Sequence, residues 1–153
     1  MGSIAHPARS VALTPFGPVT LVEEAGVLLR LDWGAFPGEG SALLEEAVRQ
    51  LAAYFDRSLA RFDLPLDWGT GLSAAVRRAM AEIPLGQTRT YGEIAKAVKA
   101  PAQAVGQACG ANPLPILIPC HRVTGTDWFG GFSAPGGVET KAALLRHEGA
   151  LLL

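Results

Sequence analysis

The sequence predicts an α+β protein in which a small, strand-rich N-terminal α/β domain packs on a mostly helical C-terminal domain with a helix-turn-helix. Apolar residues alternate with other residues over positions 11–36, which is typical of β-strands, and later recur at helical spacing. A stretch rich in proline, tryptophan and glycine, residues 62–71, separates the two patterns and indicates a linker. We therefore expect the two domains to span residues 1–68 and 69–153.

The N-terminal half is predicted to begin with strands and to continue with one helix. Turns are expected at residues 15–18 and 25–26, where glycine and proline interrupt the alternation. A loop at residues 37–40 leads to Ser41, which is a good helix N-cap because its hydroxyl can accept a hydrogen bond from a free backbone amide. The apolar residues that predict the helix itself are Leu44, Val48, Leu51 and Phe55.

The C-terminal half is predicted to consist of short helices. The first covers residues 72–82. Thr90 and Glu93 have capping-box spacing, so another helix is expected to start there. Pro101 follows a turn and suits the first position of a further helix, residues 102–109. Two short helices joined by a tight turn indicate a helix-turn-helix, although many helical hairpins bind no nucleic acid.

The composition excludes several classes of protein. With 49% hydrophobic and 18% charged residues, the chain should fold rather than remain disordered. No apolar run reaches the roughly 18 residues that indicate a membrane span, so no membrane partner is expected. Cys109 and Cys120 are the only cysteines and do not form a C-x-x-C pair, which favours a reducing cytoplasm. With only His6, His121 and His147 besides, we expect no zinc site, no other metal and no cofactor.

Positive charge is concentrated in one segment of the chain. Residues 1–75 hold five Lys and Arg against nine Asp and Glu, a net charge of −4. Residues 76–123 hold six against two, a net charge of +4, and residues 124–153 hold two against three. This distribution is expected if only the middle segment meets phosphate groups, but a chance fluctuation explains it equally well.

The second helix of the predicted pair is almost bare of large side chains. Its small residues are Ala102, Ala104, Gly106, Ala108 and Gly110. Glycine lowers helix propensity, so another requirement must favour small residues there. Close packing within the protein is one explanation, and close approach of the helix backbone to a ligand or a DNA groove is the other.

The residue pattern around Cys120 predicts a reactive thiol. A lone cysteine is usually a buried apolar filler, but His121 and Arg122 follow this one directly, and adjacent basic groups promote the nucleophilic thiolate. Adjacent residues in an extended chain point apart, so His121 is expected to act through a water molecule or a turn. Its second ring nitrogen needs an acceptor, for which Glu148 in the final helix is the candidate.

Several segments between residues 70 and 150 carry a family resemblance. They are residues 84–88, 90–95, 112–113, 116–123, 130–132 and 141–149. These segments, above all Pro119-Cys120-His121-Arg122-Val123, resemble the active-site signature of the O6-alkylguanine-DNA alkyltransferases. The acidic N-terminal half is similar to the less well-defined α+β domain of that family.

The resemblance implies a DNA repair protein and methylated-DNA–protein-cysteine methyltransferase activity. Removal of an alkyl group from a guanine oxygen requires a soft nucleophile that attacks carbon, with guanine as the leaving group. The product is a thioether, so one protein molecule would accept one alkyl group and be consumed. The target base would have to be flipped out of the duplex, while the bare helix of this monomer lies in the DNA minor groove. The alternative is a lesion-binding or regulatory module whose cysteine reacts seldom or with another substrate.

The resemblance also implies a role for each catalytic residue. Cys120 would accept the alkyl group, and His121 would activate it through water with Glu148 as the orienting acceptor. Asn112 would hold the turn around the site by hydrogen bonds from its side chain to the backbone. Tyr91 would donate a proton or a hydrogen bond to the departing base.

Further residues would form the substrate pocket and the DNA surface. Backbone groups of Cys120 and Val123 would accept from the guanine amino group, Phe132 would supply an aromatic ring, and the Ser133 amide would lie near the base oxygen. The expected DNA contacts are Arg89, Thr90, Ala102, Gln103, Gly106 and Arg122.

The chain departs from the family pattern at the DNA surface. Gln103 stands where the family places an arginine that fills the gap left by the flipped base, and glutamine lacks the charge and the stacking plane. Gly110 stands where some members carry another basic residue. The aromatic ring expected near the flipped base is that of Phe132, which lacks a hydroxyl. All three changes predict weaker or altered DNA engagement. The alkyltransferase-like proteins that sense lesions without repairing them replace the cysteine, whereas this chain retains Cys120, which favours transfer chemistry.

Overall fold

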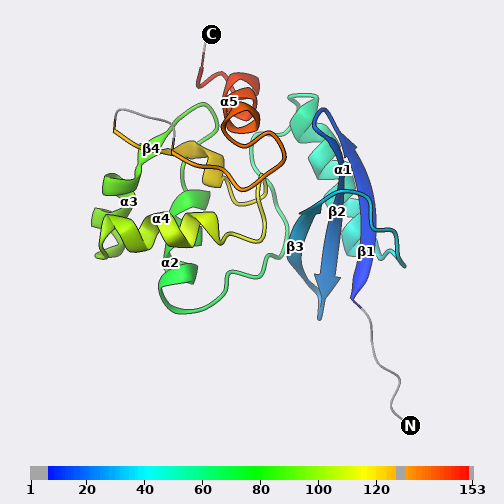
Figure 1. Cartoon of the computed structure of the whole chain (residues 1–153). Helices are drawn as coiled ribbons and strands as arrows, with labels where there is room; N and C mark the ends of the chain where they lie inside the picture. The colour runs from blue at the N-terminus through cyan, green and yellow to red at the C-terminus, as the bar shows by residue number, and fades with distance from the viewer. Residues whose placement is uncertain (1–6, 127–129, 152–153) are drawn as a thin grey trace. The chain divides into compact units, whose positions relative to one another are not determined.

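The computed structural model describes residues 7–126 and 130–151, and contacts divide the chain into two compact units, Met1–Asp67 and Trp68–Leu153 (Figure 1). His6, which the sequence analysis considered as a metal ligand, lies outside the described residues. Within the described ranges, no helix has both the length and the apolar character needed to cross a membrane.

The first unit has strands followed by a helix, as predicted, and its three strands form an antiparallel sheet. Its elements are β1 (Ala8–Thr14), β2 (Gly17–Glu24), β3 (Val27–Trp33) and α1 (Ala42–Phe55). The strand order is β1-β2-β3, and both turns lie at the predicted positions. The Ser41 hydroxyl caps α1 by accepting from the Leu44 amide at 3.1 Å. The sheet ends earlier than residue 36, because Gly34 adopts a φ of 119° and its carbonyl accepts from the Thr20 hydroxyl at 2.8 Å.

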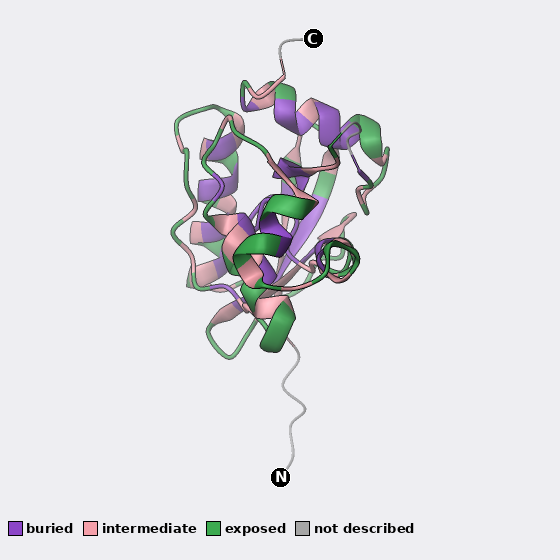
Figure 2. Cartoon of the chain, turned by 90° about the vertical axis from the view of Figure 1, so that its left-hand side faces the viewer, coloured by how far each residue is buried: buried purple, intermediate pink, exposed green. Residues whose placement is uncertain are grey.

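The second unit is mostly helical, which confirms the predicted α+β class. Its elements are α2 (Gly71–Ala81), β4 (Arg89–Thr90), α3 (Tyr91–Val98), α4 (Ala102–Gly110), the 3-10 turn η1 (Cys120–Arg122), β5 (Val123–Thr124) and α5 (Val138–His147). The helices carry stripes of buried and exposed residues (Figure 2), as expected where an amphipathic helix buries one face. The buried side chains include Val76, Met80, Ile94, Val105, Leu114 and Leu144.

Helices α3 and α4 are the predicted helix-turn-helix pair. The capping box is present: the Thr90 hydroxyl accepts from the Glu93 amide at 3.1 Å, and the Glu93 carboxylate accepts from the Thr90 amide at 3.0 Å. Helix α3 ends at Val98, and its C-cap Lys99 takes the left-handed conformation with a φ of 57°. Pro101 is the N-cap of α4 and not its first helical residue, because its ψ of 144° is still extended.

A short parallel strand pair, which the sequence analysis did not anticipate, connects the helix pair to the cysteine segment. Arg89 pairs with Val123, and Thr90 pairs with Thr124. Tyr91 begins α3 directly after β4, and η1 ends directly before β5. The pairing therefore brings Tyr91 and Cys120, which are 29 positions apart in the sequence, to one region of the second unit.

Candidate active site

The segment that leads to Cys120 is held in place by Asn112. The Asn112 amide nitrogen donates to the Ile118 carbonyl at 3.0 Å, and its oxygen accepts from the Leu114 amide at 3.1 Å. These are the side-chain to backbone bonds expected of Asn112. Cys120 then opens the 3-10 turn η1, so Cys120 and His121 lie on a turn and not on an extended segment.

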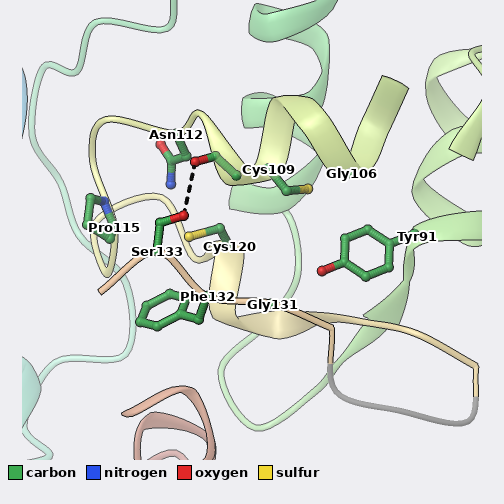
Figure 3. A pocket seen from close by; sticks show the side chains of 10 residues that line it. Tyr91, Gly106, Cys109, Asn112, Pro115, Cys120, Gly131, Phe132 and Ser133 are labelled. Carbon is green, nitrogen blue, oxygen red and sulfur yellow. Dashed lines mark hydrogen bonds between the residues drawn. The ribbon is translucent and has the colours of Figure 1, made fainter. Parts of the chain in front are cut away.

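A pocket of about 180 Å³ opens beside Cys120 (Figure 3). Four segments supply its walls: the start of α3, the end of α4, the Asn112–Cys120 segment and the loop before α5. The lining residues are Tyr91, Gly106, Cys109, Gly110, Asn112, Pro115, Cys120, Gly131, Phe132 and Ser133. The Ser133 hydroxyl donates to the Gly110 carbonyl at 3.4 Å and so links the loop to α4. The structure thus brings Tyr91, Asn112, Cys120, Phe132 and Ser133 together, as the sequence analysis expected.

His121 and Glu148 form a buried pair next to this turn. His121 Nε2 and Glu148 Oε2 lie 2.7 Å apart, and both side chains have an exposed fraction of 0%. Burial lowers the pKa of His121, although the bond to Glu148 acts in the opposite direction. Burial would raise the pKa of Glu148, but the hydrogen bonds from His121 and Arg122 bring it to about 2. The neutral imidazole therefore donates through Nε2, and Nδ1 is a buried atom without a hydrogen-bond partner in the described part of the chain.

Arg122 does not fit its predicted place at the DNA surface, and that prediction is wrong. Its exposed fraction is 6%. Its Nε donates to Glu148 Oε1 at 2.8 Å, its Nη2 to Glu148 Oε2 at 3.0 Å and its Nη1 to the Ile83 carbonyl at 2.7 Å. A buried arginine stays charged, so it needs such partners, and here they lie inside the protein.

The two cysteines differ in their surroundings. Burial raises the pKa of Cys120, while the Asn112 side chain, the Lys141 ammonium group and the backbone amides of Cys120 and His121 lower it. Cys109 lacks these backbone contacts; burial raises its pKa to about 12, and its sulfur contacts that of Met80 at 3.5 Å. Cys120 thus has backbone donors beside its sulfur that Cys109 does not have. No group of three or more His, Cys, Asp or Glu side chains suited to a metal occurs among the described residues.

Lys141 is a functional candidate that the sequence analysis did not assign. It is fully buried on α5, and its Nζ donates to the Val123 carbonyl at 2.6 Å and to the Gly131 carbonyl at 3.3 Å. Burial lowers its pKa to about 8, whereas the negative charge of the Cys120 and Cys109 thiolates acts in the opposite direction. Val123 was expected in the substrate pocket, but it is fully buried and does not line the pocket. Its carbonyl accepts the hydrogen bond from Lys141.

Tyr91 lies at the far side of the pocket from Phe132 and directs its hydroxyl toward the pocket (Figure 3). Burial, together with the nearby Cys109 and Cys120 sulfurs, raises its pKa, so the phenol keeps its proton and can donate. The backbone of Gly130 lies directly against this ring. A Cβ atom on Gly130 would be 2.3 Å from Tyr91 Oη.

The residues expected to contact DNA differ in their exposure and in their hydrogen bonds. Ala102 and Gln103 are exposed on the first turn of α4, and Gly106 lines the pocket. A Cβ atom built on Gly106 or on Gly110 would meet no atom within 4 Å. Packing within the protein therefore does not explain these glycines, which leaves close approach of a ligand as the better explanation. The Thr90 hydroxyl is engaged in its helix cap, and the guanidinium of Arg89 makes an exposed hydrogen bond to the Thr88 carbonyl at 2.9 Å.

Comparisons with known proteins identify the family of the chain. Two family descriptions match the chain: the ribonuclease-like domain of 6-O-methylguanine DNA methyltransferase over residues 9–68, and its DNA binding domain over residues 72–150. A methylated-DNA–protein-cysteine methyltransferase of Mycobacterium bovis is 42% identical over 151 residues, with 88% of each chain covered.

A relative of the same name from Methanosarcina barkeri is 40% identical over 148 residues, which cover 88% of this chain and 92% of that protein. The crystal structure of Mycobacterium tuberculosis OGT in complex with DNA matches with a TM-score of 0.81 and 40% identity. That match covers 92% of this chain and 91% of the other. The chain therefore belongs to the 6-O-methylguanine DNA methyltransferase family.

Proposed function

We propose that this protein repairs DNA by transferring the alkyl group of O6-alkylguanine to the sulfur of its own Cys120. The observation that carries this proposal is a nucleophile at the wall of a pocket, beside a buried His121–Glu148 pair with a bare ring nitrogen. The names of the relatives support the same reaction. Residues 69–153 would form the DNA-binding and alkyl-acceptor domain.

The proposed reaction begins with loss of the thiol proton. Because burial raises the pKa of Cys120, the thiol needs a base, and Nδ1 of His121 would take the proton through one water molecule. The thiolate then attacks the alkyl carbon, and the S–C bond forms as the C–O bond breaks. The electron pair moves to the guanine, which takes up a proton with Tyr91 as the donor at the pocket wall. The thioether cannot be hydrolysed by these side chains, so each molecule reacts once.

The exposed face of α4 is the proposed DNA contact. The base oxygen is inaccessible inside a duplex, so the nucleotide must be flipped into the pocket. Two glycines on α4, Gly106 and Gly110, leave the helix backbone open at the pocket mouth, which supports close approach to the minor groove. Readout in that groove is largely blind to sequence, which suits a repair protein. We further propose that the protein acts as a monomer in the cytoplasm.

Mass mapping of the reacted protein tests this function. After incubation with an oligonucleotide that contains O6-methylguanine, the intact protein should gain one methyl group, and peptide mapping should place it on Cys120. The Cys120→Ala variant should gain no mass, while Cys109→Ala should react like the wild type. An adduct chiefly on Cys109 would contradict the assignment. Binding of the damaged duplex without any gain in mass would instead favour a lesion-binding module.

The position of Gln103 leads to a prediction about base flipping. It is exposed on the first turn of α4, and arginine there would add a charge and a stacking plane. Gln103→Arg should therefore speed transfer from duplex DNA, by about tenfold if the flipped state gains about 1.4 kcal/mol. Transfer from free O6-benzylguanine skips flipping and should not change. Single-turnover rates with both substrates measure this, and equal changes in both would mean that residue 103 acts on the active site itself.

A further inference from the structure

We infer that Arg122 is a positioning residue that keeps His121 neutral, and therefore able to accept a proton, by balancing the charge of Glu148. The inference rests on the proposed role of His121 as the base for Cys120. It assigns to Arg122 a part in the reaction that differs from the DNA contact expected from the sequence.

The geometry of the three side chains supports this inference. Arg122 contacts both carboxylate oxygens of Glu148, at 2.8 Å to Oε1 and 3.0 Å to Oε2. Oε2 also lies 2.7 Å from His121 Nε2, so the carboxylate is shared between a permanent cation and the imidazole. The third guanidinium nitrogen donates to the Ile83 carbonyl at 2.7 Å, which fixes the plane of the fork.

Burial makes the charge balance of this cluster important. The side chains of His121 and Glu148 are fully buried, and that of Arg122 has an exposed fraction of 8%. In such surroundings, a carboxylate whose only partner was an imidazole would favour protonation of that imidazole. Because Arg122 contacts both oxygens, the charges of the carboxylate and the guanidinium cancel, and the imidazole can remain neutral.

The other charged groups around His121 act in the same direction or do not reach it. Lys141 on α5 is a second cation, and both it and Arg122 lower the pKa of His121. Helix α2 also packs against η1. Of the two arginines on α2, Arg78 lies over the ring of Trp68, at 4.5 Å from its centroid, and Arg77 lies against Gly69. Glu148 is thus the anion that acts on His121, and Arg122 is the cation bonded to it.

Loss of the Arg122 charge should convert the base into its conjugate acid. Glu148 would remain a buried carboxylate without a cationic partner, and protonation of His121 would be the nearest way to balance it. An imidazolium has no lone pair on Nδ1 and cannot take the thiol proton. The rate of alkyl transfer would then depend on pH in a range where the wild type does not respond.

The test is the pH dependence of alkyl transfer from free O6-benzylguanine, measured together with an NMR titration of the His121 imidazole. The free base keeps DNA binding out of the readout. In Arg122→Gln, we expect the rate at pH 7 to fall at least tenfold and to recover as the pH is raised. The midpoints of the profile and of the His121 titration should both rise to about one pH unit above 7, because only then is the neutral imidazole reduced about tenfold at pH 7.

Two further variants separate charge from structure. Arg122→Lys keeps the charge without the fork, so its midpoint should stay near that of the wild type even if its rate is lower. Arg122→Gln combined with Glu148→Gln removes both charges, so the midpoint should return toward the wild-type value. A purely structural arginine would give lower rates at every pH with no shift in either midpoint, and that result would overturn the inference.

A second comparison keeps the inference testable if Arg122→Gln does not fold. The double variant differs from Glu148→Gln only by the loss of the Arg122 charge. The midpoint of its His121 titration should therefore lie at a higher pH. Equal midpoints in these two proteins would contradict the inference. Failure of the proposed function would look different, because the wild-type protein itself would then take no alkyl group from O6-benzylguanine or from alkylated DNA.

Discussion

Replacement of Gly130 by alanine should lower the rate of alkyl transfer about 100-fold, which is the order of loss expected when a reacting group is misplaced by about 1 Å. The added Cβ would lie 2.3 Å from Tyr91 Oη and 2.8 Å from its Cε2. Both distances are far below van der Waals contact, so the ring must move from its present position. The hydroxyl that is proposed to donate to the departing base would be displaced with it.

Alanine at position 130 also destabilises the fold through backbone strain that does not involve Tyr91. A control variant must therefore show the effect of this strain by itself. Gly130 has a φ of 79°, a left-handed conformation that costs an L residue roughly 1–2 kcal/mol. Gly26, in the turn between β2 and β3, has a φ of 81° and no atom within 4 Å of its added Cβ.

Gly26→Ala should therefore lose a similar amount of stability and keep its activity. Thermal unfolding and single-turnover rates with free O6-benzylguanine measure both quantities. If the two variants react at the same rate, backbone strain and not the position of Tyr91 would be responsible for any loss.

The local parts of the fold could be predicted from the sequence, because their causes lie within a few residues. The Ser41 cap and the Thr90–Glu93 capping box need only a hydroxyl and a carboxylate at fixed spacing. The pairing of Arg89 and Thr90 with Val123 and Thr124 joins segments more than 30 residues apart. Two-residue strands carry no alternation that a pattern could reveal, so this link between Tyr91 and Cys120 was missed.

Residues of the candidate site could be predicted where the chemical needs of a side chain, and not its place in the fold, identified its partner. Histidine needs an acceptor, and Glu148 was expected to be that acceptor before the 2.7 Å contact was known. Arg122 was misplaced because a charged residue in a basic segment suggests an exposed surface. The signal for Lys141 was present but unused: positions 141, 144, 145 and 148 share one helix face, and Leu144 and Leu145 mark that face as buried.

Replacement of Lys141 by methionine should lower the rate of alkyl transfer at neutral pH at least tenfold. The Lys141 ammonium group lowers the pKa of Cys120, and its loss should raise that pKa, with a tenfold decrease in thiolate for each unit. The Val123 and Gly131 carbonyls would also lose the donor that links β5 to the pocket loop. The pH dependence of thiolate absorbance, measured in a Cys109→Ala background, reports the change at Cys120 alone. Lys96→Met, which alters an exposed lysine, should leave it unchanged.

The same substitution should change how stability depends on pH. The pKa of Lys141 is about 8 in the folded protein and 10.5 for an ordinary lysine. Between these values the unfolded chain binds more protons than the folded one, so the contribution of Lys141 to the free energy of unfolding rises with pH. Below pH 8 both states are protonated, and burial of the charge destabilises the fold by a constant amount. Wild type should therefore gain stability relative to Lys141→Met as the pH increases from about 8 to 10.5, which chemical denaturation at several pH values can measure. A constant difference across this range would mean that Lys141 has the same pKa in the folded and the unfolded protein, and it would contradict the lowering of this pKa by burial.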